Sequence, residues 1–265
     1  MSLHYYQKRL VQDFFNFSLL FRRNHDSHIV SMHQAGTHWL RNLITHVIAR
    51  EHGLPIPADI RSDDVVGSIK KPPRHGGPVV VQTHSIPSPL FACRVLRSVL
   101  PYPKYLVLVR DPRVMLASHY KKRKKDSPWS FSEYLRSSKK TRQFRKNIWW
   151  DLRFLNTWLP LAKRWPEHIR VVRYEDLRAD TLGELKKIVE YFGIKVSDPE
   201  TLAWSVAMCS KEAMSQKEAD ERAHKVVRQD ERDPLLIYTP EDRQYFMDTY
   251  RRYLKADLGY NLEKW

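Results

Sequence analysis

Short apolar runs alternate along this chain with longer segments whose apolar residues recur at helical spacing. Four runs are rich in β-branched or aliphatic residues and are predicted to be strands: 28–33, 78–83, 104–110 and 168–173. Each is almost continuously apolar through its middle, which is typical of a strand covered by helices on both faces. The intervening and following pattern predicts helices over 37–51, 88–100, 112–125, 142–165, 180–192, 199–208 and 240–256.

This alternation predicts an α/β fold of three layers, in which helices flank a central parallel sheet with right-handed crossovers. We expect one domain over residues 1–265, because no Gly/Ser linker, low-complexity tract or repeat divides the chain. Within it, 1–25 is predicted to be an N-terminal helical segment and 28–260 the core. A chain of 265 residues is long enough to bury such a core.

The connection between the first strand and the first helix is the most informative segment. The strand over 28–32 enters a short turn that contains Gly36, and the chain leaves the turn as an amphipathic helix. This arrangement directs backbone N–H groups and the positive end of a helix dipole at one point, which suits a phosphate or a sulfate. The Walker signature is absent, so an ordinary ATP or GTP site is not indicated. Taken alone, the segment is also compatible with a tight βα connection that binds nothing.

Four short motifs follow one another at or just after the ends of the predicted strands, where parallel sheets bind ligands. They are Q-A-G-T-H-W at 34–39, Q-T-H-S-I-P at 82–87, R-D-P followed by serine at 110–118, and Y-E-D at 174–176. In this order they resemble the motifs of sulfotransferases that use 3′-phosphoadenosine-5′-phosphosulfate (PAPS). The resemblance implies a P-loop NTPase-like fold and transfer of a sulfuryl group from PAPS to a hydroxyl acceptor, with PAP as the product.

The resemblance also assigns the donor site. Trp39 would stack on adenine, although a core tryptophan under the loop is the alternative. Arg110 and Ser118 would bind the 3′-phosphate, whereas Arg110 could instead pair with Asp111 or Asp176. The segment around Ser210 and the 227–234 lid depart from the family pattern, since the lid has no glycines. The residues expected to bind the donor are Ala35, Gly36, Thr37, His38, Trp39, Arg110, Ser118, Tyr174, Ser210 and Arg228.

His84 matches the family's general base, because a neutral imidazole can accept the proton of the acceptor hydroxyl near neutral pH. His33 and His38 are its competitors, since they flank the same loop. The family usually has lysines where this chain has Gln34 and Gln82, and glutamine brings a hydrogen bond but no charge.

Two interpretations follow from these glutamines. Another cation could replace the lysines, and the candidates are Arg41, Arg113, Lys121 and Lys122. Alternatively, the chain binds the nucleotide but is catalytically impaired. His84, Gln34 and Gln82 are therefore the residues expected at the reacting centre.

The formal net charge of +16 favours anionic partners, and eleven Lys or Arg against two acids lie within 121–146. A solvated face is the simplest interpretation of this run, and steering of an anionic donor or acceptor is the functional one. A nucleic-acid surface over 121–150 is disfavoured because no DNA- or RNA-binding motif accompanies it. The expected acceptor is a hydroxyl-bearing small molecule or glycan, such as a sugar, a glycolipid or a small alcohol.

Cys93 and Cys209 are too few for a disulfide framework or a metal site, so we expect a reduced, cytoplasmic protein without a metal. No signal peptide is evident. The apolar stretch 10–21 is too short to span a bilayer. It is predicted to pack on the sheet, and peripheral contact with a membrane surface is the alternative.

Overall fold

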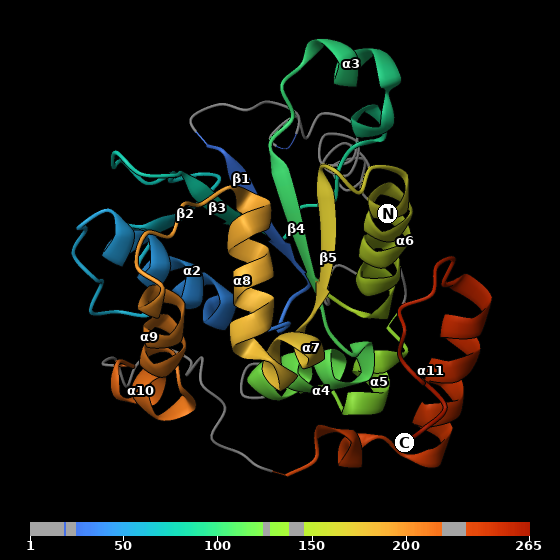
Figure 1. Ribbon diagram of the computed structural model, residues 1–265. Helices are drawn as coiled ribbons and strands as arrows, with labels where there is room; N and C mark the ends of the chain where they lie inside the picture. Colours follow the sequence, from blue (N-terminus) through green and yellow to red (C-terminus); the bar gives the residue numbers. More distant parts are fainter. Residues whose placement is uncertain (1–18, 20–24, 124–127, 138–145, 219–231) are drawn as a thin grey trace.

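The computed structural model describes residue 19 and residues 25–123, 128–137, 146–218 and 232–265. Its centre is a sheet of five strands in the order β2-β3-β1-β4-β5, and every neighbouring pair is parallel (Figure 1). The strands are β1 (Ser27–Ser31), β2 (Val66–Ser68), β3 (Val80–Thr83), β4 (Lys104–Val109) and β5 (Ile169–Arg173). The four predicted strands are confirmed, with ends that differ from the predicted bounds by at most two residues. The edge strand β2 was not predicted.

The parallel register brings the carboxyl ends of the strands to one edge of the sheet. Val30 of β1 lies between Thr83 of β3 and Val107 of β4. The last residue of β5, Arg173, pairs with Val109 of β4. The segments that follow β1, β3, β4 and β5 therefore begin side by side, at the lower edge in Figure 1. This edge holds all four sequence motifs.

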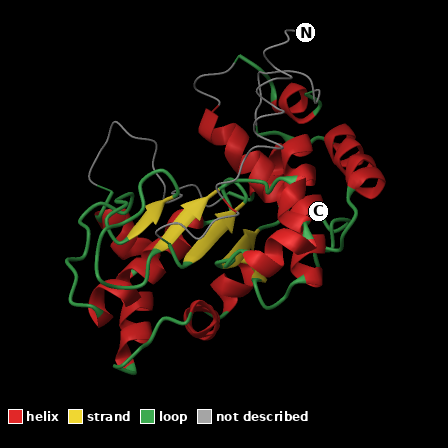
Figure 2. Ribbon diagram, turned by 90° about the horizontal axis from the view of Figure 1, so that it is seen from above, coloured by secondary structure: helices red, strands yellow, loops and turns green. Residues whose placement is uncertain are grey.

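Helices cover both faces of the sheet, which explains why the strands are apolar throughout (Figure 2). On one face, α2 (Thr37–Glu51) and α8 (Thr181–Phe192) pack on the sheet and on each other, with α9 (Glu200–Met208) outside α2. On the other face lies α6 (Ile148–Arg164), whose buried Trp158 ring is 5.8 Å from that of Tyr105 in β4.

The remaining elements differ from the predictions mainly where they are short. The predicted helix over 88–100 is split into the 3-10 turn η2 (Pro89–Ala92) and α3 (Arg94–Val99), because Cys93 between them is extended. The helix predicted over 142–165 begins at Ile148 after its N-cap Asn147, and residues 142–145 lie outside the described part of the chain. The others are α4 (Pro112–Arg123), α5 (Phe131–Leu135), α7 (Tyr174–Ala179), α10 (Lys211–Gln216), η4 (Pro234–Ile237) and α11 (Pro240–Tyr253).

Candidate active site

The turn between β1 and α2 has the backbone of an anion-binding loop. Gly36 is the N-cap of α2 with a φ of 88°, and no side chain caps this helix start. The first helical hydrogen bond runs from the N–H of Leu40 to the Gly36 carbonyl at 3.1 Å. The earlier N–H groups, which include those of Thr37, have no partner within the helix and point out of its start. Residue 36 must also be glycine for space, because an added Cβ would lie 2.5 Å from Cδ2 of Tyr174.

Arg110 connects this loop to the ends of β4 and β5. Its Nη1 donates a hydrogen bond to the Gln34 carbonyl at 3.0 Å, and its guanidinium lies 4.2 Å from the centre of the Tyr174 ring. The alternative ion pairs are not formed, because Arg113 takes the Asp111 carboxylate at 2.6 Å. The Asp176 carboxylate likewise pairs with Arg173, at 2.7 Å. Arg110 is therefore held beside the loop, and its role in binding the donor stays a prediction.

The aromatic residues predicted to surround adenine also converge here. The Trp39 ring is partly exposed and lies 5.7 Å from that of Tyr174, at an angle of 67°. Its Nε1 donates to the Cys209 carbonyl at 3.0 Å, which fixes the indole in place. The hydroxyl of Ser210 caps α10 by accepting from the N–H of Ala213. Ser118 is a half-buried residue of α4, and Arg228 lies outside the described residues.

His84 follows β3 and turns back onto β1. Its Nδ1 lies 2.9 Å from the Ser31 carbonyl, and a carbonyl can only accept, so this nitrogen carries the hydrogen. In the neutral ring Nε2 is then the acceptor, which is the tautomer that a general base needs. Although His84 is exposed to solvent, the protein atoms around its ring reduce its hydration, and this desolvation lowers the pKa of the imidazole below the ordinary value. The positive charge of Lys146 lowers the pKa further.

Ser31 links the base to the loop, and the sequence analysis missed it. Its Oγ lies 2.7 Å from Oγ1 of Thr37 and 3.2 Å from Nδ1 of His84. The serine is buried, and its contact with Thr37 is shielded from water. His33 lies on the other side of the base, with its ring centre 4.0 Å from that of His84. Ser31 therefore connects Thr37 of the loop directly to the base His84, so a displacement of the loop would be passed to the base through this serine.

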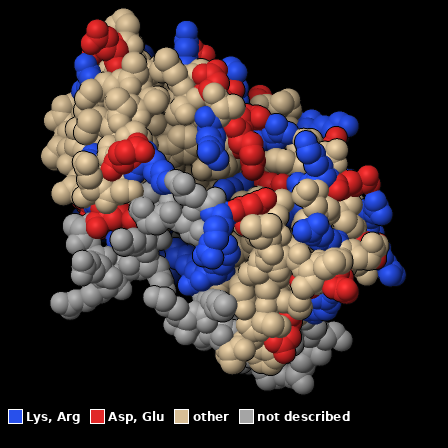
Figure 3. Space-filling model, turned by 90° about the horizontal axis from the view of Figure 1, so that it is seen from below, with Lys and Arg blue, Asp and Glu red and all other residues tan. Residues whose placement is uncertain are grey.

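The surroundings of His38 are strongly basic. Burial lowers the pKa of His38 to about 3, and the charges of Arg41, Lys122 and Arg61 contribute further. Several cations thus lie near the start of α2. In the view from below, onto the carboxyl edge, Lys and Arg side chains gather around a hollow in the surface (Figure 3). The field of such a hollow attracts a multiply charged anion.

The comparison with known proteins agrees with this geometry. A family model described as the sulfotransferase domain matches residues 24–235. The chain belongs to the sulfotransferase family. No curated protein matches it. The predicted α/β fold, with helices on both sides of a parallel sheet, is confirmed for this sulfotransferase.

Solved structures share the fold at low sequence identity. A mouse sulfotransferase complexed with PAP is 20% identical, with a TM-score of 0.57, over 94% of this chain and 94% of the other. Retinol dehydratase, in a complex with retinol and PAP, is 17% identical with a TM-score of 0.56. That alignment covers 92% of this chain and 86% of the other.

Two of the cations proposed to replace the family lysines have structural roles instead. Arg41 is buried and donates to Asp63 at 3.0 Å and to the Ile60 carbonyl at 2.7 Å. Arg113 is buried against Asp111. Of the remaining candidates, Lys121 is exposed, and Lys122 is half-buried near His38.

A further cation lies just before the start of α6, at a position that none of the four sequence motifs includes. Lys146 precedes α6 and lines a small hollow together with His33, His119 and Asp151. His33 is the neighbour of the base in the ring contact described above. Tyr134 fixes the backbone here, since its hydroxyl donates to the Lys146 carbonyl at 2.8 Å.

In the described part of the chain, no three His, Cys, Asp or Glu side chains lie together in a way that could hold a metal ion. Among the same residues, no helix is long and apolar enough to cross a membrane.

Proposed function

We propose that this sulfotransferase moves a sulfuryl group from PAPS to a hydroxyl acceptor, with His84 as the general base. The observation that carries the proposal is the link from Thr37 through Ser31 to His84, which couples an anion-binding helix start to a base in the correct tautomer. The PAP bound to the mouse sulfotransferase and to retinol dehydratase supports the same donor.

The reaction needs no covalent intermediate. As the sulfur–oxygen bond to the 5′-phosphate breaks, a new bond forms between sulfur and the acceptor oxygen. The acceptor proton passes to Nε2 of His84, and PAP leaves with the electron pair. Catalysis is then mostly positioning and stabilisation of charge, as in phosphoryl transfer. Gly36 and Arg110 would hold the two phosphates of the donor, while Trp39 and Tyr174 would enclose adenine.

We propose that Lys146 supplies the charge that Gln34 and Gln82 lack. Lys146 borders the small hollow beside His33, and its positive charge contributes to lowering the pKa of His84. Arg41 and Arg113 are held in buried ion pairs. Lys146→Met is expected to lower kcat by about 10²-fold, the usual effect of losing one well-aimed donor. Adding Gln82→Lys to this variant should restore much of the rate, because lysine then returns at the family position.

A catalytically impaired, nucleotide-binding protein is the second interpretation, and the two glutamines favour it. The same variants separate the two interpretations. If the parent protein is inactive with every acceptor and gains turnover only with Gln34→Lys and Gln82→Lys, the impaired interpretation is correct. Turnover by the parent that falls in Lys146→Met excludes it.

The acceptor is proposed to be a hydroxyl-bearing compound, such as a sugar, a glycolipid headgroup or a small alcohol. Retinol dehydratase has been solved with retinol and with androsterone, both of which bear a hydroxyl. A cytoplasmic location, with or without peripheral membrane contact, remains part of this proposal.

Calorimetric titration with PAP tests the donor, with AMP as the comparator that lacks the 3′-phosphate. We expect PAP to bind at least tenfold more tightly than AMP, and Arg110→Ala to remove this preference, since one charged hydrogen bond is worth about 1.5–3 kcal/mol. His84→Ala should retain PAP binding while losing about 10²–10⁴-fold in turnover. Equal affinity for PAP and AMP in the parent would refute the proposed donor.

A further inference from the structure

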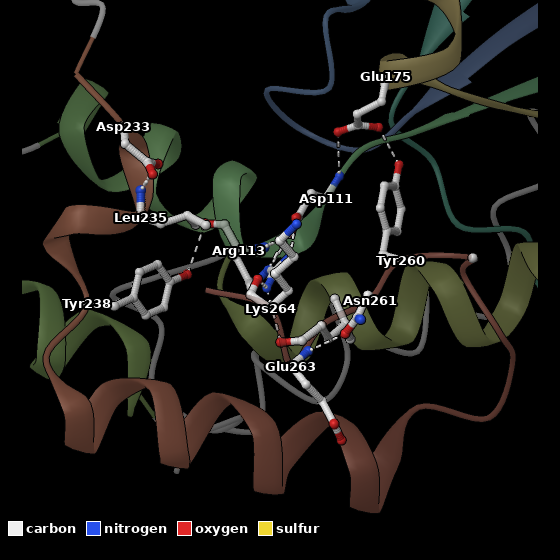
Figure 4. Close-up of polar contacts among 12 residues, drawn as sticks. Asp111, Arg113, Glu175, Asp233, Leu235, Tyr238, Tyr260, Asn261, Glu263 and Lys264 are labelled. Carbon is white, nitrogen blue, oxygen red and sulfur yellow. Dashed lines mark hydrogen bonds and ion pairs between the residues drawn. The ribbon is translucent and has the colours of Figure 1, made fainter.

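Residues 259–265, here called the tail strap, lie against the ends of β4 and β5 and the segments that follow them (Figure 4). They fall outside residues 24–235, the part that the family model matches. Gly259 anchors the strap, because its carbonyl accepts from Nη1 of Arg173 at 2.6 Å. The strap then makes two separate contacts with the segment that carries Arg110.

The first contact runs through Glu175. The hydroxyl of Tyr260 donates to Oε2 of Glu175 at 2.5 Å, and Oε1 of the same carboxylate accepts from the N–H of Asp111 at 3.1 Å. One carboxylate thus bridges the strap to the backbone at the end of β4. Burial, together with Glu175, raises the pKa of the Tyr260 hydroxyl, so this group stays a donor at neutral pH.

The second contact runs through Arg113. Its guanidinium forms a fork with the Asp111 carboxylate, through Nε at 3.0 Å to Oδ1 and Nη2 at 2.6 Å to Oδ2. The remaining nitrogen, Nη1, donates to the strap carbonyls of Leu262 at 3.0 Å and Lys264 at 2.6 Å. Arg113 is only 5% exposed, and the ring of Trp265 lies 5.2 Å from its guanidinium. The strap therefore completes the hydrogen bonding of a buried cation.

Both contacts end on residues adjacent to the donor site. Asp111 directly follows Arg110, and Glu175 directly follows Tyr174. Arg110 and Tyr174 are themselves in contact, at 4.2 Å. The strap thus fixes the two chain segments whose side chains meet at the proposed phosphate site. The charge of the Asp111 carboxylate is balanced by Arg113, which the strap carbonyls help to hold in place.

We infer that the tail strap positions Arg110 for the 3′-phosphate of the donor, with Tyr260 and Arg113 as positioning residues. The inference rests on the proposed function. A strap with a merely structural role would affect stability, and it would weaken every nucleotide equally. A positioning role instead predicts loss of the preference for a 3′-phosphate. A side chain held by two hydrogen-bonded neighbours loses its alignment when either neighbour is released.

The experiment measures dissociation constants for PAP and AMP by calorimetry in the full chain and in three variants. Tyr260→Phe removes one hydroxyl, and Arg113→Lys keeps the charge but removes the fork. Tyr250→Phe is the matched control, because the Tyr250 hydroxyl is buried and has no hydrogen-bond partner among the described residues. Tyr260→Phe is expected to weaken PAP about three- to tenfold and Arg113→Lys by about tenfold or more, with AMP nearly unchanged. The control should keep the affinities of the parent.

Three results are distinguishable. A weaker affinity for PAP, with an unchanged affinity for AMP, in both Tyr260→Phe and Arg113→Lys supports the inference. Unchanged PAP affinity, or equal weakening of PAP and AMP, overturns it while leaving the proposed donor intact. A parent protein that does not distinguish PAP from AMP overturns both the inference and the proposed donor.

Discussion

Replacing Gly36 by alanine tests the donor loop at its tightest point. An added Cβ would lie 2.5 Å from Cδ2 and 2.7 Å from Cε2 of Tyr174, far inside normal contact. The ring is not the free end of a flexible chain, because it packs against Arg110 at 4.2 Å and lies near Trp39. Relief of the clash must therefore move the loop, or the ring together with its neighbours.

Two costs add up in this variant. The backbone of Gly36 has a φ of 88°, a conformation that costs an alanine about 1–2 kcal/mol. Restoring ordinary carbon contacts of about 3.5–4.0 Å requires a shift of about 1 Å, and overpacking of this kind costs about 1–3 kcal/mol. We therefore expect Gly36→Ala to lower the free energy of unfolding by about 2–5 kcal/mol. PAP affinity should fall more than tenfold, since the shift displaces the phosphate loop and Arg110.

Gly193→Ala separates the two costs. Gly193 ends α8 with a φ of 71°, and an added Cβ there meets nothing within 4 Å. This control carries the backbone strain of about 1–2 kcal/mol without the clash, and PAP binding should be that of the parent. Urea denaturation gives the stabilities, and calorimetry gives the affinities. If Gly36→Ala loses no more stability than Gly193→Ala and binds PAP normally, the close approach of the loop to Tyr174 is wrong.

Three further predictions concern residues around the site and in the core. Burial lowers the pKa of His28 well below 6.5, so its contribution to stability is complete above that pH and is lost as the pH falls. Relative to the parent, His28→Leu should thus gain about 2 kcal/mol between pH 7 and pH 5 in urea denaturation, and a constant difference would contradict this. Arg41→Met removes the ion-pair partner of Asp63, so it should lower the stability of the protein by about 2 kcal/mol while kcat stays near that of the parent. A large loss of kcat without loss of stability would make Arg41 catalytic. Trp39→Phe removes the bond to Cys209 and should weaken PAP and AMP equally in calorimetry, since both carry adenine; weakening of PAP alone would exclude an adenine contact.

The sequence predicts the fold where the hydrophobic pattern is long. The helix predicted over 37–51 matches α2 at both ends, because fifteen residues with a regular apolar stripe follow a glycine turn. The strand β2 is missed, since Val66–Ser68 is three residues with a glycine at its centre and shows no period. Helix α7 is missed for another reason: its first residues, 174–176, form the motif at the end of a strand and are also the first turn of the helix. Short elements are fixed by packing with the rest of the chain, which no local pattern records.

The candidate site divides in the same way. Gly36, His84 and Arg110 lie at one edge of the sheet because parallel strands bring their carboxyl ends together, so motifs far apart in sequence meet there, while the roles that the resemblance gives these residues stay predictions. Ser31 was not predicted, because a serine inside an apolar strand gives no signal until the register places it beside His84. The position of Lys146 follows from the start of α6, which lies against the same edge. A positive charge acts through space and does not depend on the segment that carries it, so a lysine lost from a motif can be replaced from another helix. The two glutamines favour the impaired interpretation only where no other cation takes their place, and the rate of Lys146→Met with and without Gln82→Lys is the measurement that distinguishes a relocated charge from a missing one.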